Sequence, residues 1–268
     1  MLKWLTMLVL LLHTTITYAE QIRISIPKVS DSPNQHLFYH ELLSLAIKEI
    51  GHTPILTVSD VPQLRIKQYL DNGEISIYWM LETPERNLRY IPVEVDITNG
   101  LIGQRILLIK NGDQGLYDQV KSLEDFRSLD LVGGMGLGWF DASVWQANDL
   151  PYKEYTGNWK SIFKMTANGR EFDYFARGVN EVTLEHNQYP ELQIESKLLF
   201  IYDRDFRFYL SKTGLNSGKK YEAIISLALK TAKESGLIKR LVNKYWSKEI
   251  ELLNSDKRIK IHLSLPHL

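Results

Sequence analysis

Cysteine is absent from the 268 residues, and neither sign of charge is in excess. Without cysteine the chain has no disulfide, no thiolate metal site, no cysteine nucleophile and no cysteine for lipid attachment. The 32 Lys and Arg residues balance 32 Asp and Glu residues, so no net field attracts phosphate backbones or anionic lipids, and we expect no nucleic-acid partner. Hydrophobic residues make up 44% of the chain, which is enough for one large domain or two ordinary ones.

Long apolar runs are also missing, except near the N-terminus. Residues 4–12 are almost wholly apolar, Lys3 precedes them, and Thr17 and Ala19 are small residues at the positions that a signal peptidase reads. A run of about nine apolar residues is too short for a membrane anchor, which needs ~20. We therefore predict a cleaved signal peptide over residues 1–19 and a periplasmic protein that is not inserted in the membrane after cleavage.

Strand and helix patterns alternate from residue 20 onward. Strands are expected at 22–26, 53–58 and 75–78, with helices from a capping box at Ser32 to Ile50 and over 61–72. This βαβαβ order predicts a parallel sheet. A second series follows Gly100, with strands expected at 105–110, 129–132, 172–175, 198–202 and 206–210, and helices at 122–125, 140–147, 158–168, 179–187, 219–235 and 237–246.

The glycine-rich run 133–138 lies between a predicted strand and a predicted helix. Its spacing fits neither the dinucleotide fingerprint nor the phosphate-binding loop of nucleotide triphosphatases. Two interpretations stay open. The run is a tight structural turn, or the free NH groups at the start of the helix at Phe140, beside Trp139, hold an anion such as a carboxylate.

Two arginines follow predicted strands at their carboxyl ends, where open α/β sheets bind ligands. Arg86, in Thr83-Pro84-Glu85-Arg86, is able to grip a carboxylate through two parallel hydrogen bonds, unless it pairs with a neighbouring glutamate. Arg177 lies at a similar strand end with Glu181 four residues on. The two arginines together predict an acidic or doubly anionic ligand, unless Glu181 neutralises Arg177.

Residues for metal or nucleophilic chemistry are few. His36 and His40 are four apart with Glu41 beside them, a spacing that can place two imidazoles on one zinc ion. No third ligand is identifiable, and a solvated histidine pair is the alternative. Because no Ser/His/Asp set can be nominated either, we predict no catalytic residue, no metal site and no cofactor.

The order of the motifs resembles the bacterial extracellular solute-binding proteins of family 3, the type II periplasmic binding proteins that deliver amino acids to ABC importers. The resemblance covers about residues 21–246. It rests on Thr83-Pro84-Glu85-Arg86, Ser122-Leu123-Glu124-Asp125, the glycine run, and an ending from Ala232-Lys233-Glu234-Ser235-Gly236-Leu237 to Lys244-Tyr245-Trp246.

This resemblance implies a two-lobed α/β fold, in which each lobe is a mixed, mainly parallel sheet flanked by helices and the ligand lies in the cleft between the lobes. Lobe 1 would comprise residues 20–104 plus 205–250, lobe 2 residues 105–204, and a C-terminal tail residues 251–268.

The resemblance also implies roles for particular residues. The arginine of Thr-x-x-Arg, which binds the ligand's carboxylate in the family, falls on Arg86. The family's glycine turn, which supplies NH groups to the same carboxylate, falls on Gly136, Gly138 and Trp139. Trp79 or Tyr39 would contact the ligand's side chain. The acidic residue that usually receives the ammonium aligns with Gly178, so that Glu181 is the nearest substitute. Together with Arg177, which is nominated from its strand end, the expected ligand-binding residues are Arg86, Thr83, Trp79, Tyr39, Gly136, Gly138, Trp139, Arg177 and Glu181.

The implied function is recognition without chemistry. A monomer would capture a small polar, carboxylate-bearing ligand, an amino acid or a related acid, and deliver it to an ABC permease. Two alternatives stay open. In the first, the same cleft would serve as the ligand-binding module of a membrane sensor. In the second, the protein would be an enzyme, since some relatives with this fold are exported dehydratases of cyclic acids, and Glu181 beside Arg177 is the candidate general acid.

Overall fold

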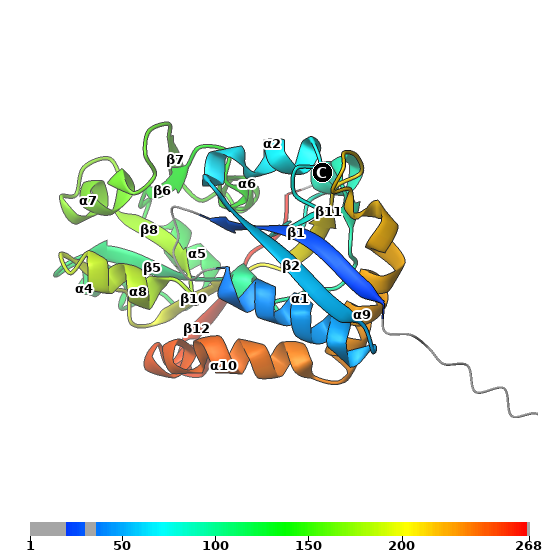
Figure 1. Ribbon diagram of the computed structural model, residues 1–268. Coiled ribbons are helices and arrows are strands. Elements are labelled where there is room, and N and C mark those ends of the chain that lie inside the picture. The colour runs from blue at the N-terminus through cyan, green and yellow to red at the C-terminus, as the bar shows by residue number, and fades with distance from the viewer. Residues whose placement is uncertain (1–19, 30–35, 267–268) are drawn as a thin grey trace, which may run out of the picture.

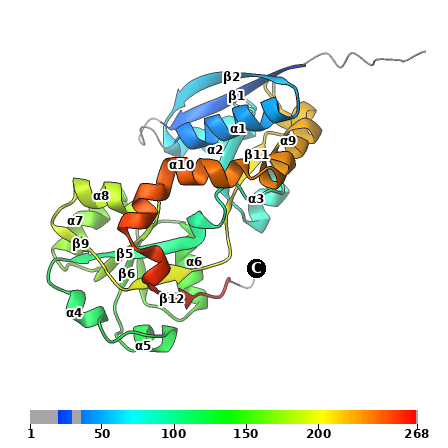
Figure 2. The same ribbon diagram turned by 90° about the horizontal axis from the view of Figure 1, so that it is seen from below.

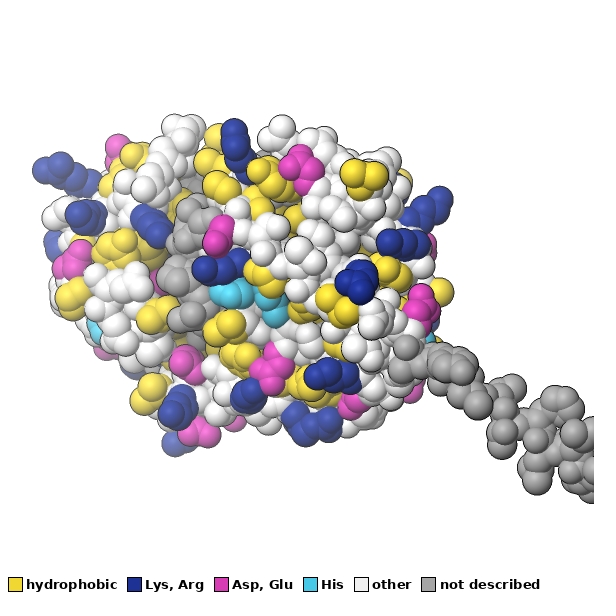
Figure 3. Space-filling model, in the orientation of Figure 1, with side chains coloured by type: hydrophobic (Ala, Val, Ile, Leu, Met, Phe, Trp, Pro, Cys, Tyr) yellow, Lys and Arg dark blue, Asp and Glu magenta, His cyan; other side chains and the backbone are white. Residues whose placement is uncertain are grey.

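The computed structural model describes residues 20–29 and 36–266. The predicted signal peptide and the predicted capping box at Ser32 lie outside these residues. The described chain forms two α/β lobes, which Figure 2 shows one above the other. Charged side chains of both signs are interspersed on the face shown in Figure 3, as expected from the balanced composition.

The first lobe contains two small sheets covered by helices (Figure 1). Its elements are β1 (Gln21–Val29), α1 (Leu37–Glu49), β2 (Thr53–Val61), η1 (Gln63–Arg65), α2 (Ile66–Asp71), β3 (Ile77–Leu81), α3 (Pro84–Arg89), β4 (Ile91–Pro92), β11 (Phe206–Leu210), η3 (Gly218–Tyr221), α9 (Glu222–Glu234) and α10 (Leu237–Leu252). Strands β1 and β2 are parallel, as predicted. Strand β3 instead pairs antiparallel with β11, which also pairs with β4. The chain just before β3 still joins β1, because the Ser76 amide donates to the Ser25 carbonyl at 2.7 Å.

The second lobe is built on a seven-stranded sheet with the order β12-β10-β5-β8-β6-β7, in which β9 also pairs with β5. Its elements are η2 (Leu101–Gly103), β5 (Gln104–Lys110), α4 (Gln114–Tyr117), α5 (Leu123–Arg127), β6 (Gly133–Gly136), α6 (Phe140–Ala147), β7 (Tyr152–Tyr155), α7 (Ser161–Ala167), β8 (Tyr174–Gly178), α8 (Val182–Gln188), β9 (Leu192–Ile194), β10 (Leu198–Ile201), η4 (Ser255–Lys257) and β12 (Ile259–His262). Strand β6 is parallel to β7 and β8, whereas β5 is antiparallel to β8, β9 and β10.

Three of the four glycines in the glycine-rich run lie in a strand, β6. The sequence pattern placed this strand four residues earlier. The reason lies in tertiary packing. A Cβ atom on Gly133 would lie 2.8 Å from the ring of Tyr174, and one on Gly134 would lie 2.7 Å from Ile162 and 2.9 Å from the ring of Phe172. Such distances are far below van der Waals contact, so the glycines allow this strand to pass between bulky side chains.

Two chain segments cross between the lobes, and Asp205 ties them together. Its buried carboxylate accepts hydrogen bonds from the Thr98 hydroxyl, from the Gly100 amide at 2.8 Å and from the Phe206 amide at 2.6 Å. Thr98 and Gly100 belong to the outgoing segment, and Asp205 and Phe206 belong to the returning one. Burial raises the pKa of Asp205, and these donors act in the opposite direction by favouring the charged form.

The C-terminal arm makes a third connection between the lobes. Helix α10 packs against α1 and α9 in the first lobe, and Figure 2 shows it running down to the second lobe. The segment expected to be a tail, 251–268, there contributes β12, which pairs in parallel with β10. Arg258 anchors it, because its buried guanidinium donates to the carbonyl oxygens of Glu195 at 2.6 Å and Leu198 at 3.0 Å.

We predict that β12 is an integral part of the second lobe. The Ile261 side chain is 2% exposed, whereas its neighbour Lys260 is exposed. Ile261→Ala should therefore lower the free energy of unfolding by about 3 kcal/mol, the cost of a cavity in a packed core. Lys260→Ala, the control on the same strand, should change it by less than about 0.5 kcal/mol. Urea denaturation measures both, and equal small effects would mean that β12 is a dispensable appendage.

Candidate functional site

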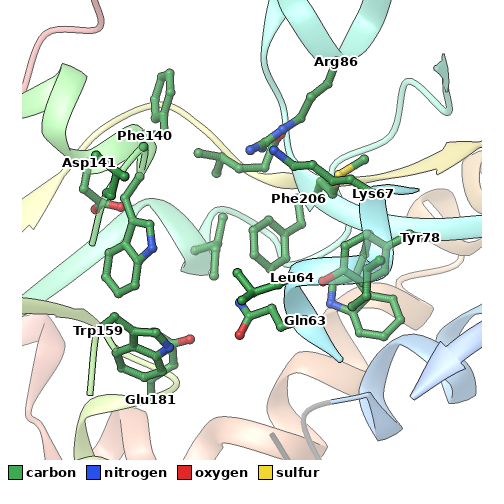
Figure 4. A pocket seen from close by; sticks show the side chains of 18 of the residues that line it. Gln63, Leu64, Lys67, Tyr78, Arg86, Phe140, Asp141, Trp159, Glu181 and Phe206 are labelled. Carbon is green, nitrogen blue, oxygen red and sulfur yellow. The ribbon is translucent and has the colours of Figure 1, made fainter. Parts of the chain in front are cut away.

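A cavity of about 460 Å³ lies between the lobes and is lined by both. Its size is within the range of small-molecule sites, ~300–1,000 Å³. Six of the residues nominated from the sequence line it: Trp79, Arg86, Gly138, Trp139, Arg177 and Glu181. The other lining residues with polar, charged or aromatic side chains are Gln63, Lys67, Tyr78, Arg105, Phe140, Asp141, Trp159 and Phe206. Figure 4 shows most of these side chains around the cavity.

Arg86 faces the cavity without a carboxylate partner. Thr83 caps α3, accepting a hydrogen bond from the Arg86 amide at 3.3 Å, and thereby starts the helix that carries the arginine. The guanidinium donates to the Leu81 carbonyl at 2.5 Å, but no ion pair of the described residues includes it. The nearby Glu82 pairs with Arg204 instead, at 3.2 Å. Burial lowers the pKa of Arg86, as expected for a cation with no opposite charge to compensate its lost hydration.

Aromatic rings form the wall beside Arg86. Trp79 lines the cavity, and Tyr39 of α1 lies behind it with the two ring centres 4.2 Å apart and the planes inclined by 12°. Tyr39 does not line the cavity. Its position as a backing for Trp79 differs from the direct ligand contact that the resemblance implies, because the larger Trp79 occupies the space in front of it.

Arg177 is held between two glutamates. Its Nε and Nη2 donate to Glu185 at 2.7 and 2.6 Å, and Nη2 also lies 3.0 Å from Glu181. The guanidinium carbon is 5.2 Å from the ring centre of Trp139 and 5.1 Å from that of Trp159. Burial lowers the pKa of Arg177, but the two glutamates outweigh burial and raise it overall. Arg177 is therefore a structural cation of the second-lobe wall, whose charge is neutralised by carboxylates. Glu181 is the partner that the sequence suggested, and Glu185 is a second one.

A second buried ion pair, Arg105 with Asp141, lines the same wall and was not anticipated from the sequence. The Arg105 Nε donates to Asp141 at 2.6 Å, and the Tyr202 hydroxyl donates to the same carboxylate oxygen at 3.0 Å. Burial raises the pKa of Asp141, but Arg105 outweighs it, so that the pKa is lowered. Only the positions of the two residues could have pointed to this pair. Arg105 lies at the start of a strand that follows the crossing between the lobes, and Asp141 lies in the first turn of the predicted helix at Phe140.

The amides expected to hold a carboxylate are engaged within the protein. The Gly138 amide donates to the Glu154 carboxylate at 2.7 Å, the Leu137 amide to the Tyr155 carbonyl at 3.2 Å, and the Trp139 amide to the Gly136 carbonyl at 3.1 Å. The start of α6 is the other anion site expected from the sequence, and it offers the amides of Phe140 and Asp141, which helix geometry leaves without an intrahelical acceptor.

Gly136 lies behind the wall and has a steric role. A Cβ atom there would lie 2.5 Å from the indole of Trp139. The glycine is therefore required for the indole to occupy its observed place against the strand.

Lys67 was also not nominated from the sequence. It lies on α2, lines the cavity and is exposed. Burial by the cavity walls lowers the pKa of Lys67, and the positive charge of Arg86 lowers it further. The predictive signal was its place in the helix that follows β2, because helices that start at the carboxyl ends of strands border ligand clefts.

His36 directly precedes α1 and His40 lies on it, with the centres of the two rings 4.9 Å apart. The His40 ring nitrogen lies 3.0 Å from the Pro27 carbonyl, and Glu41 pairs with Lys244 at 2.6 Å. Within residues 20–29 and 36–266, no group of three or more potential metal ligands is assembled. In the same residues no helix is long and apolar enough to span a bilayer.

Comparison with solved structures identifies the fold. The probable amino-acid ABC transporter extracellular-binding protein ytmK of Bacillus subtilis is similar with a TM-score of 0.61 and 14% identity, over 84% of this chain and 98% of that one. An ancestral arginine-binding protein bound to arginine has a TM-score of 0.55 and 17% identity, over 84% and 98%. The ancestral amino-acid-binding protein AncCDT-1, a precursor of cyclohexadienyl dehydratase, has a TM-score of 0.54 and 17% identity, over 84% and 95%.

No protein-family model matches the sequence, and no curated protein matches it. At the low identities of the solved structures, the likeness concerns the fold alone. The chain therefore has the two-lobed α/β fold of the substrate-binding proteins of amino-acid ABC transporters, which confirms the fold expected from the motif order.

The two nominated arginines should differ in their effect on stability. Arg177→Met leaves two carboxylates together in a buried wall, so we expect the free energy of unfolding to fall by about 3 kcal/mol or more. Arg86→Met removes a cation with no carboxylate partner and should change it by less than about 1 kcal/mol. Thermal or urea unfolding of the two variants measures the difference. Similar losses in both would contradict the distinction between a structural and a ligand-facing arginine.

Proposed function

We propose that the protein is an exported solute-binding protein, which holds a small carboxylate-bearing ligand, an amino acid or a related acid, between its lobes. One observation supports this most strongly. Arg86 is a half-buried cation in the cavity wall without a carboxylate partner, whereas Arg105 and Arg177 in the opposite wall are both ion-paired. A ligand carboxylate would supply the charge that Arg86 lacks.

The energetic argument follows from the environment of Arg86. Charge-assisted hydrogen bonds between arginine and carboxylate are stronger than neutral ones, and they strengthen further when water is excluded. Closure of the two lobes over the ligand excludes water and completes contacts to both walls. Because only the closed state makes all of these contacts, the ligand shifts the protein towards that state.

The remaining walls supply apolar contact and orientation. Trp79 on one side and Trp139 and Trp159 on the other present rings to the cavity, and aromatic rings beside placed polar groups are common in small-molecule sites. The amides of Phe140 and Asp141 offer donors from the second lobe. The proposed role is therefore binding without chemical conversion, in the periplasm, followed by delivery of the ligand to an ABC importer.

Glu181 is poorly placed as the general acid of a dehydratase. Its carboxylate lies 3.0 Å from Arg177 and also accepts from the Gly178 amide at 3.4 Å. Both contacts engage this carboxylate within the wall, where it holds Arg177 and the turn that precedes α8. We therefore favour a binding protein over an enzyme.

The test is the affinity of Arg86 variants. A thermal-shift screen of residues 20–268 against amino acids and small organic acids identifies the ligand, because a ligand that binds only the folded state raises the melting temperature. For the best ligand, Arg86→Met should raise the Kd by about 30-fold or more, the scale of about 2 kcal/mol for losing a charged partner.

Arg89→Met is the matched control. Arg89 lies on the same helix but pairs outward with Asp71 at 2.5 Å, so its loss should leave the Kd unchanged. Calorimetry measures both values. An unchanged Kd in Arg86→Met would remove Arg86 from the binding site, and turnover of the ligand to a product would replace the binding role by an enzymatic one.

A further inference from the structure

We propose that Lys67 and Arg86 form one paired cationic site, and that the ligand carries two acidic groups, one for each cation. This inference rests on the proposed function, since it identifies the class of ligand for the same cavity. It makes Lys67 the residue that determines specificity for ligands with a second acidic group.

The first argument is the distribution of charge between the two walls. Of the residues that line the cavity from the first lobe, Lys67 and Arg86 alone are charged, and both are cations. Among residues 20–29 and 36–266, neither has a carboxylate within 4.0 Å. In the second-lobe wall each arginine is matched by at least one carboxylate. The unmatched positive charge of the cavity is thus concentrated on one wall.

The second argument is the placement of the two cations. Figure 4 shows the Lys67 ammonium and the Arg86 guanidinium directed at the same end of the cavity, from α2 and α3. Like charges that share a partly desolvated site repel each other, and the lowered pKa of Lys67 has the charge of Arg86 as one of its causes. An anion beside both cations lowers this repulsion, and a second acidic group lowers it further.

The third argument is stoichiometric. One carboxylate satisfies the planar fork of Arg86 through two parallel hydrogen bonds. Lysine is a point charge with three donors and needs an acceptor of its own. A ligand whose single carboxylate is held by Arg86 therefore leaves the Lys67 ammonium with solvent as its acceptor, whereas a second acidic group gives it an ionic partner. Around the pair, Tyr78, Trp79 and Phe206 provide contact for the carbon skeleton between the acidic groups.

Matched pairs of ligands test the proposal in the unmodified protein. Glutarate and pentanoate differ only in an acid group replaced by a methyl, as do succinate and butyrate, and glutamate and norvaline. We expect the two-acid member of at least one pair to bind at least tenfold more tightly in calorimetry at neutral pH. A preference for glutarate indicates a ligand without an ammonium group, and a preference for glutamate indicates a ligand with one. Either result supports a ligand with a second acidic group.

Variants of Lys67 then assign the preference. Lys67→Met should reduce the ratio of the two Kd values to below threefold while leaving the affinity for the one-acid member within threefold of its original value. Lys67→Arg keeps the charge and should keep the preference. Lys48→Met, which removes an exposed lysine of α1 outside the cavity lining, is the control and should change neither value. Melting temperatures of all variants show that they are folded.

The outcomes separate the two proposals. If one-acid ligands bind as tightly as two-acid ligands, or if Lys67→Met retains the preference, the paired cationic site is wrong and the binding function stands. If no acid of either kind binds to the unmodified protein, the proposed function falls and the ligand class falls with it.

Discussion

The carboxylate of Asp205 is the interaction on which the geometry of the cleft depends. It joins the two crossing segments through donors from Thr98, Gly100 and Phe206, so that both segments leave the hinge in fixed directions. Strand β11 begins directly after Asp205 and pairs with β3. The hydrogen bonds of Asp205 therefore also orient β3, the strand that precedes α3 and Arg86. A buried acid with several donors holds the two segments side by side, since separating them would leave polar groups unpaired.

The two walls of the cavity differ in whether their charged side chains are paired within the protein. In the second lobe, Arg105 and Arg177 are fixed by carboxylates, and Arg177 is further enclosed by the rings of Trp139 and Trp159. Buried pairs of this kind form a rigid surface, because breaking one costs several kcal/mol, about 3–5. In the first lobe, Arg86 has no such partner. The second-lobe wall thus has its charges paired within the protein, whereas the first-lobe wall carries unmatched positive charge.

Sequence reasoning succeeded where local patterns determine the structure. The helix over 140–147 and the strand over 206–210 have the bounds that periodicity predicts, and the Thr-Pro helix start brings Arg86 to the cavity wall. It missed features set by distant residues. The glycine strand depends on Tyr174 and Phe172, and β12 depends on pairing with β10. Lys67 carries no local signal beyond its helix, since a lone lysine on a helix is ordinarily solvated.

The third connection changes how the lobes are able to move. A hinge of two crossing segments permits rotation about the line through them, and the rotation opens or closes the cleft. Helix α10 packs on α1 and α9, yet the residues after it are anchored in the other lobe by Arg258 and β12. Rotation of the lobes must therefore bend the link between Leu252 and Arg258. This link contains Asn254, whose φ of 49° is in the left-handed region, a conformation found at turns rather than within helices. The change of direction between α10 and β12 is thus made at one short turn, which leaves α10 packed on the first lobe and β12 paired in the second.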